Sequence, residues 1–196
     1  MADIKSALEI AREKIEKLGE ATDEERLKWQ YVPEGEKLAV RYLKQDSNLV
    51  AELSQYEEKA TKYVSEGAAD VLVRYISLPK DAMAKRNNKK AMEGLKILKR
   101  DKVGVENVFT KIRRIFNHYL DQGEQQRKQA YESLKADFEA KLQQAVQQQL
   151  GLSMRMNIDV TRQPQFQEEW RRVQAQLDSQ YLRLLDEYKQ ELLRMA

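Results

Sequence analysis

Apolar residues recur along most of the chain at intervals of three and four positions, which is the spacing of one face of an α-helix. This pattern predicts a first helix over residues 4–18. The TDEE stretch, Thr22–Glu25, fits a capping box at the start of a second helix. Pro33 should end that helix, because proline lacks an amide hydrogen, and it is well suited to the first turn of the next one.

The middle of the chain predicts longer helices. From Ser47 or Asn48, helical spacing continues to Pro79. Gly67 weakens this segment by about 1 kcal/mol relative to alanine. We therefore expect one long helix up to the proline.

Two aspartates are placed to cap the helices that follow. Asp81 precedes a segment that extends to about residue 100, and Asp101 precedes a much longer one. The apolar stripe of the longer segment lapses over 121–128. We expect a kink at Gly123, or a break into two helices.

The last helix is predicted to begin at Pro164. Its apolar residues follow intervals of three and four that come close to a heptad repeat. Because 103–150 and 164–195 are both long and joined by a short connector, they should fold back on each other as an antiparallel pair. The stripe consists of Phe166, Trp170, Val173, Leu177, Tyr181, Leu184, Tyr188 and Leu192.

The connector itself has a different pattern. Between Leu152 and Val160 every second residue is apolar, including Met154, Met156 and Ile158. This two-residue period predicts a half-buried strand. No comparable strand exists elsewhere in the sequence, so the segment either lies on a helix as an extended connector, pairs with a second copy across a twofold axis, or adds to a sheet of another protein.

These patterns predict an all-α fold. We expect an elongated helical bundle with a long, coiled-coil-like antiparallel hairpin and one short extended segment near 152–160. We expect two domains, an amino-terminal helical bundle over 1–100 and a hairpin over 101–196, although the two could form a single domain.

Composition narrows the class of protein. Seven glycines and three prolines among 196 residues are few, which argues against a loop-rich or all-β fold. The absence of cysteine excludes disulfides and thiolate chemistry. There is no run of about 18 apolar residues for a membrane span, and the charged first 19 residues lack the apolar core of a signal peptide. We expect a cytoplasmic protein.

The sequence offers little for catalysis. Its single histidine, His118, has Ile115 three positions before it, so the Glu-x-x-His signature of di-iron bundles is absent. No glycine-rich phosphate-binding motif occurs. We therefore predict no enzymatic activity, no metal and no cofactor.

Positive charge is concentrated between Lys80 and Arg114, where twelve Lys or Arg residues stand against four Asp or Glu. A basic helix surface could contact phosphates, although the stretch lacks the interleaved aromatic residues that stack on bases. A solvated face that contacts acidic parts of the protein is the simpler interpretation. The residues that could contact an anion or a nucleic acid are Lys85, Arg86, Lys89, Lys90, Lys96 and Lys99.

The patterns together favour a non-enzymatic, self-associating helical scaffold or adaptor that mediates protein–protein interaction. A dimer is the favoured oligomer, and the identity of any other protein partner is not encoded in a motif. The alternative is a nucleic-acid-associated helical protein that uses the basic 80–114 surface. For self-association the expected residues are Met154, Met156, Ile158, Val160, Phe166, Trp170, Val173, Leu177, Tyr181, Leu184 and Tyr188.

Overall fold

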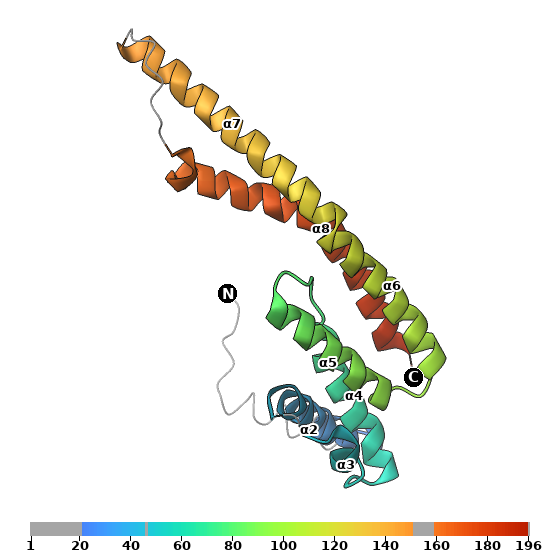
Figure 1. Cartoon of the computed structure of the whole chain (residues 1–196). Coiled ribbons are helices and arrows are strands. Elements are labelled where there is room, and N and C mark those ends of the chain that lie inside the picture. Colours follow the sequence, from blue (N-terminus) through green and yellow to red (C-terminus); the bar gives the residue numbers. More distant parts are fainter. Residues whose placement is uncertain (1–20, 46, 151–158, 196) are drawn as a thin grey trace, which may run out of the picture. The chain divides into compact units, whose positions relative to one another are not determined.

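The computed structural model describes residues 21–45, 47–150 and 159–195. Within these ranges the regular elements are all helices, and no strand occurs, so the all-α prediction is confirmed (Figure 1). The predicted helix over 4–18 lies outside the described residues. The elements are α2 (Asp23–Gln45), α3 (Leu49–Leu53), α4 (Glu58–Tyr75), α5 (Ala82–Leu98), α6 (Lys102–Leu120), α7 (Gln122–Leu150), the 3₁₀ helix η1 (Val160–Arg162) and α8 (Pro164–Arg194).

Side-chain caps begin several of these helices where the sequence predicted them. At α2 the Thr22 amide donates to Glu25 Oε2 at 2.8 Å, and the Glu25 amide donates to Thr22 Oγ1 at 3.3 Å, which completes the capping box. Asp81 Oδ1 accepts from the Ala84 amide at 2.7 Å, and Asp101 Oδ1 accepts from the Gly104 amide at 2.8 Å. These caps satisfy amides that have no partner within the helix.

The prediction that Pro33 ends a helix is wrong. Helix α2 continues through it from Asp23 to Gln45. Proline removes the hydrogen bond to the carbonyl of Trp29, but Pro33 is exposed, and Trp29 is 50% exposed. Water can therefore reach this part of the helix, while the buried face, with Leu38 and Ala39, packs against the rest of the bundle.

The single long helix expected from residue 47 to Pro79 is instead two helices. The first begins near the predicted place, where Asn48 caps α3 by accepting from the Val50 and Ala51 amides. The chain then turns after Leu53, and α4 starts at Glu58. At the other end α4 stops at Tyr75, because Ile76 is extended.

The long segment after Asp101 breaks near the predicted place. Helix α6 ends at Leu120 and α7 begins at Gln122, so Asp121 alone separates them. The helical hydrogen bonds continue across the junction, from the Asp121 amide to Asn117 O and from the Gln125 amide to Asp121 O. The break is therefore a local turn between two nearly continuous helices.

The chain divides into two units. The first holds residues up to Ile76, together with 86–106 and 192–196, and the second holds 77–85 and 107–191. Helices α5, α6 and α8 contribute residues to both. The expected division at residue 100 remains a prediction.

In the first unit, α2 and α4 pack at very close range. A Cβ atom on Gly35 would overlap the carbonyl oxygen of Val64, and a Cβ on Gly67 would overlap that of Val32. The two backbones can approach this closely only because both positions are glycine. Leu38 and Val64 beside this crossing are fully buried, and Leu49 from α3 completes a core cluster with them.

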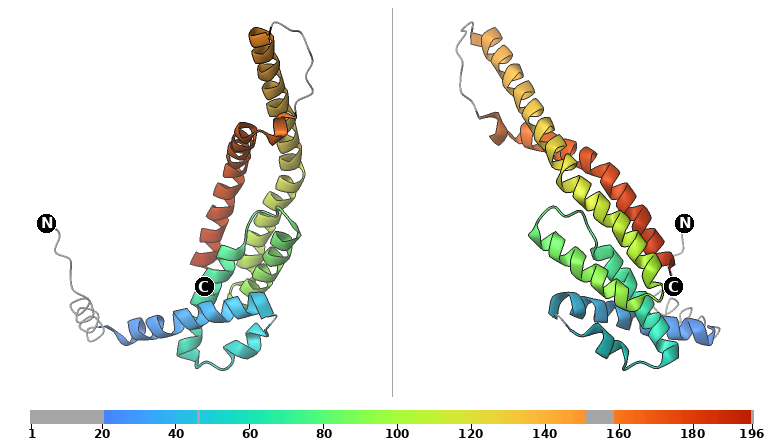
Figure 2. Two further views of the ribbon diagram at one scale, coloured as in Figure 1. Left: turned by 90° about the vertical axis from the view of Figure 1, so that its left-hand side faces the viewer. Right: turned by 45° about the vertical axis from the view of Figure 1, so that its right-hand side comes forward.

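The second unit contains the predicted antiparallel hairpin. Contacts run from Lys111–Glu191 through Tyr119–Tyr181 to Phe138–Phe166, so the residue number falls on α8 as it rises on α6 and α7. Figures 1 and 2 show α8 running back along these two helices. The prediction of a long helical hairpin is confirmed.

The predicted strand lies mostly outside the described residues, which include neither Leu152 nor Met154, Met156 and Ile158. Its last two residues are described: Asp159 is extended, but at Val160 the prediction is wrong. Val160 begins η1, where it is 1% exposed, and η1 packs against α7. Asp159 caps this turn by accepting from the Thr161 amide at 3.1 Å, and this cap favours a helical turn over an extended chain.

Because α2 and α4 pack so closely, one methyl group added at their contact should strongly affect stability. Gly67→Ala should lower the free energy of unfolding by about 1–3 kcal/mol, because the new methyl meets backbone that cannot rotate away. Urea denaturation followed by circular dichroism measures the change.

Lys37→Ala is the matched control, since Lys37 is exposed on α2, and it should change stability by no more than about 0.5 kcal/mol. A Gly67→Ala protein as stable as this control would show that the two helices do not pack so closely.

Candidate functional site in the helical hairpin

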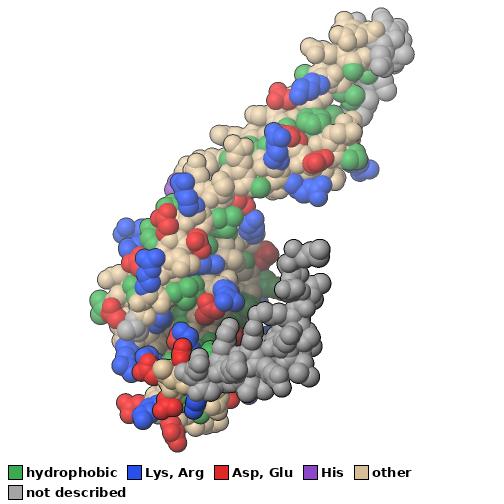
Figure 3. Space-filling model, turned by 180° about the vertical axis from the view of Figure 1, so that it is seen from behind, with side chains coloured by type: hydrophobic (Ala, Val, Ile, Leu, Met, Phe, Trp, Pro, Cys, Tyr) green, Lys and Arg blue, Asp and Glu red, His purple; other side chains and the backbone are tan. Residues whose placement is uncertain are grey.

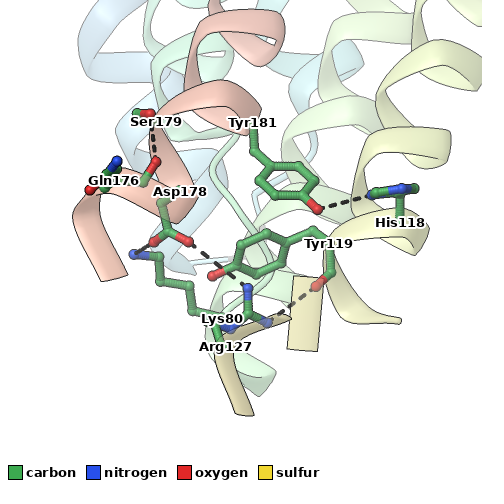
Figure 4. Close-up of polar contacts among 8 residues, drawn as sticks. All are labelled: Lys80, His118, Tyr119, Arg127, Gln176, Asp178, Ser179 and Tyr181. Atoms are coloured by element: carbon green, nitrogen blue, oxygen red, sulfur yellow. Dashed lines mark hydrogen bonds and ion pairs between the residues drawn. The ribbon is translucent and has the colours of Figure 1, made fainter. Parts of the chain in front are cut away.

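A buried carboxylate lies in the middle of the hairpin. Asp178 on α8 is 4% exposed, on the face that packs against α6 and α7. Its Oδ2 accepts from Lys80 Nζ at 2.7 Å, as Figure 4 shows. Lys80 precedes α5, so this ion pair fastens the 77–85 segment to the hairpin.

Arg127 on α7 approaches the same carboxylate. Its Nη2 donates to the carbonyl oxygen of Tyr119 at 3.1 Å, and its guanidinium carbon lies 4.1 Å from the centre of the Tyr119 ring. Arg127 Nη1 is 3.9 Å from Asp178 Oδ1, which is an ion-pair distance but too long for a hydrogen bond. The carboxylate therefore has a cation on each side.

Tyr119 on α6 closes this cluster. Its side chain is 3% exposed. Burial raises the pKa of the phenol above its ordinary value, and the neighbouring Asp178 carboxylate raises it further. The phenol therefore stays protonated well into the alkaline range.

This cluster joins α8 to α7 and to the segment before α5. A cavity of about 640 Å³ lies beside the cluster, and Arg171 and Gln174 are among the residues that line it. Within the described ranges, no three His, Asp or Glu side chains are grouped to hold a metal ion.

A groove of about 760 Å³ lies between α8 and the α6–α7 pair. Tyr181 spans it, with its hydroxyl 2.9 Å from His118 Nδ1 (Figure 4). Apolar side chains and glutamines make up most of the lining. The lining residues are Arg114, Ile115, His118, Gln126, Val173, Gln176, Leu177, Gln180, Tyr181 and Leu184.

The structure divides the predicted α8 stripe between two faces. Phe166 and Trp170 pack edge-on against Tyr131 of α7, and the ring of Tyr188 lies 5.4 Å from Lys111 Nζ. Four other members of the stripe line the groove instead, namely Val173, Leu177, Tyr181 and Leu184. Val160 is buried in η1, and Met154, Met156 and Ile158 lie outside the described residues.

Sequence reasoning missed two residues of the α8 packing face, Asp178 and Leu185. Together with Leu192, which the predicted stripe included, they are buried at intervals of seven residues. The sequence analysis did not recognise this heptad because one of its members is an aspartate, and a charged residue is not expected in a core. A search for heptads that tolerate one charged member with basic residues on the facing helix could have found it.

The basic residues of the 80–114 stretch have different surroundings. Lys99 is buried and donates to Met195 O at 2.6 Å, Lys90 donates to Leu43 O at 3.0 Å, and Lys96 pairs with Glu106. Lys85, Arg86 and Lys89 on α5 are exposed. On the face in Figure 3, basic and acidic side chains are interspersed.

Comparison with known proteins places the hairpin within a family. A family model, described as a family of unknown function (DUF6657), matches residues 50–194. The chain belongs to this family. The match takes in α4 to α8, and therefore both the Asp178 cluster and the groove.

Neither the curated proteins nor the solved structures contain a match to this chain. None of the described helices is long and apolar enough to span a membrane.

The Lys80–Asp178 ion pair predicts a specific loss of stability at alkaline pH. The hydrogen bond that Lys80 donates to Asp178 raises the pKa of Lys80 above its ordinary value. Lys80 therefore holds its proton more tightly in the folded state than in the unfolded state. The stabilisation that the ion pair adds to the fold is complete below the unfolded pKa of about 10.4 and is lost as pH rises through the folded pKa.

We expect the free energy of unfolding to fall less between pH 9 and pH 11 in Lys80→Gln than in the unmodified protein, measured by urea denaturation. Lys85→Gln, at an exposed lysine of α5, should keep the full decline. Identical declines in all three proteins would show that the ion pair does not stabilise the fold.

Proposed function

We propose that this protein is a cytoplasmic, non-enzymatic helical scaffold that forms a homodimer through the groove on its hairpin. The observation that carries the proposal is the position of Leu177 and Leu184. Both belong to the heptad-like stripe, yet both line the groove rather than the packing face, and Leu184 is 40% exposed.

The intramolecular packing of α8 supports this division of roles. Phe166 and Leu185, which face α6 and α7, are 2% and 1% exposed, so α8 has a buried packing face that does not include the two groove leucines. Leucines that the monomer does not need for its own packing are typical of interaction surfaces when they lie together. Burying them against another chain would remove apolar area from water at about 25 cal/mol per Å².

The polar part of the groove favours a second copy as the occupant. Gln126, Gln176 and Gln180 each carry an amide that both donates and accepts hydrogen bonds. In a twofold dimer the same surface meets itself, so a residue must be compatible with its own kind. Glutamine and leucine meet this requirement, whereas a surface with many charges of one sign would repel its copy.

The hairpin geometry fits a twofold contact centred on α8. Two α8 helices that cross antiparallel near Asp178 would bring Val173 of one copy opposite Leu184 of the other. Leu177 and Gln180 would then lie close to the axis. A scaffold of this kind presents two copies of the rest of the chain on either side of one helical interface.

The nucleic-acid alternative has less support in the described residues. Lys90, Lys96 and Lys99 are engaged within the chain, which leaves Lys85, Arg86 and Lys89 as the exposed part of the expected surface. Three neighbouring cations would give only a weak, strongly salt-dependent attraction to phosphates. We therefore favour the dimer.

Charge placed in the groove should prevent dimerisation. The double variant Leu177→Glu/Leu184→Glu puts four carboxylates around the proposed twofold axis, so we expect a monomer at tens of micromolar protein. Light scattering coupled to size-exclusion chromatography measures the mass.

Leu182→Glu is the matched control, because Leu182 is 49% exposed on α8 and does not line the groove. It should remain dimeric, and circular dichroism should show equal helicity in all three proteins. A monomeric unmodified protein, or a double variant that stays dimeric, would refute the proposal.

A further inference from the structure

The single histidine of the chain lies in the groove assigned to dimerisation. His118 on α6 lines it and contacts Tyr181 on α8, with 2.9 Å between Nδ1 and the hydroxyl oxygen. His118 is itself exposed, so protons reach its ring freely in the monomer. Imidazole is the side chain whose ordinary charge change falls between pH 5 and 8.

We propose that His118 makes self-association pH-dependent: the groove accepts a second copy when the imidazole is neutral and releases it when the imidazole is protonated. This inference rests on the proposed dimer. It assigns a regulatory role to one of the residues that line the proposed interface.

The groups around His118 determine the direction of the effect. Arg114 lies one turn before it on α6 and lines the same groove, and Tyr181 is the ionisable residue that faces it from α8. No Asp or Glu is among the groove-lining residues. A protonated imidazole would therefore join an existing positive charge with no carboxylate in the groove lining to compensate it.

Dimerisation would increase the free-energy cost of protonating His118. A twofold dimer would bring together two copies of Arg114 and two of His118 in a groove that the partner closes to water. Charges removed from water interact more strongly and lose hydration. Because each dimer contains two histidines, protonation acts twice on the same equilibrium.

The hydrogen bond to Tyr181 adds a second effect. A neutral imidazole can accept the tyrosine O–H at Nδ1, whereas a protonated ring can only donate there. Protonation therefore leaves the Tyr181 hydroxyl as a donor that needs a new acceptor. In water this costs little, but in a closed interface an unpaired donor is unfavourable.

The test compares pH 7.5 with pH 5.5 by light scattering and sedimentation. The unmodified protein should be dimeric at pH 7.5, and its dissociation constant should rise by about tenfold or more at pH 5.5. His118→Gln carries a neutral amide at both pH values, so its dissociation constant should be the same at both, even if the substitution in the groove changes that constant. Circular dichroism at pH 5.5 checks that both proteins remain folded.

Each contrary outcome has a distinct meaning. Equal dimerisation of the unmodified protein at both pH values overturns the role of His118 and leaves the dimer intact. If His118→Gln also dissociates at pH 5.5, carboxylates rather than the histidine are responsible, and the inference is again wrong. A monomer at pH 7.5 overturns the proposed function and this inference together.

Discussion

A carboxylate can be buried between helices only if cations and hydrogen bonds replace its hydration. In the hairpin, the buried carboxylate is that of Asp178. Its partners come from two distant parts of the chain, Lys80 before α5 and Arg127 on α7. Compensating the charge of Asp178 therefore brings three segments of the chain together. A slip of α8 by one turn would separate the carboxylate from both cations. The hairpin register, and with it the residues left for the groove, therefore depends on this cluster.

The register has a direct consequence for the surface. With Asp178 and Leu185 turned towards α6 and α7, the neighbouring Leu177 and Leu184 are turned about 100° away from them. One α8 helix thus carries two apolar stripes, one for the chain itself and one at the groove. The proposed dimer uses the second stripe, and the proposed pH dependence acts on it through the contact between His118 and Tyr181.

Local chemistry made much of the secondary structure predictable. Thr22 with Glu25, Asp81 and Asp101 cap helices where the sequence indicated, because each cap depends only on residues within three positions. The prediction at Pro33 was wrong for a non-local reason. The close packing of α2 on α4, through Gly35 and Gly67, stabilises a helix that its proline alone would interrupt.

The sequence by itself determined the helical class, the caps, the break near Asp121 and the antiparallel hairpin, because helical periodicity and side-chain caps are short-range properties. Tertiary structure decided which of two adjacent stripes on α8 is buried. Periodicity places Leu177 and Asp178 almost equally well, and hydrophobicity favours the leucine. The aspartate is buried because Lys80 and Arg127, 98 and 51 positions earlier in the chain, lie beside it only after folding.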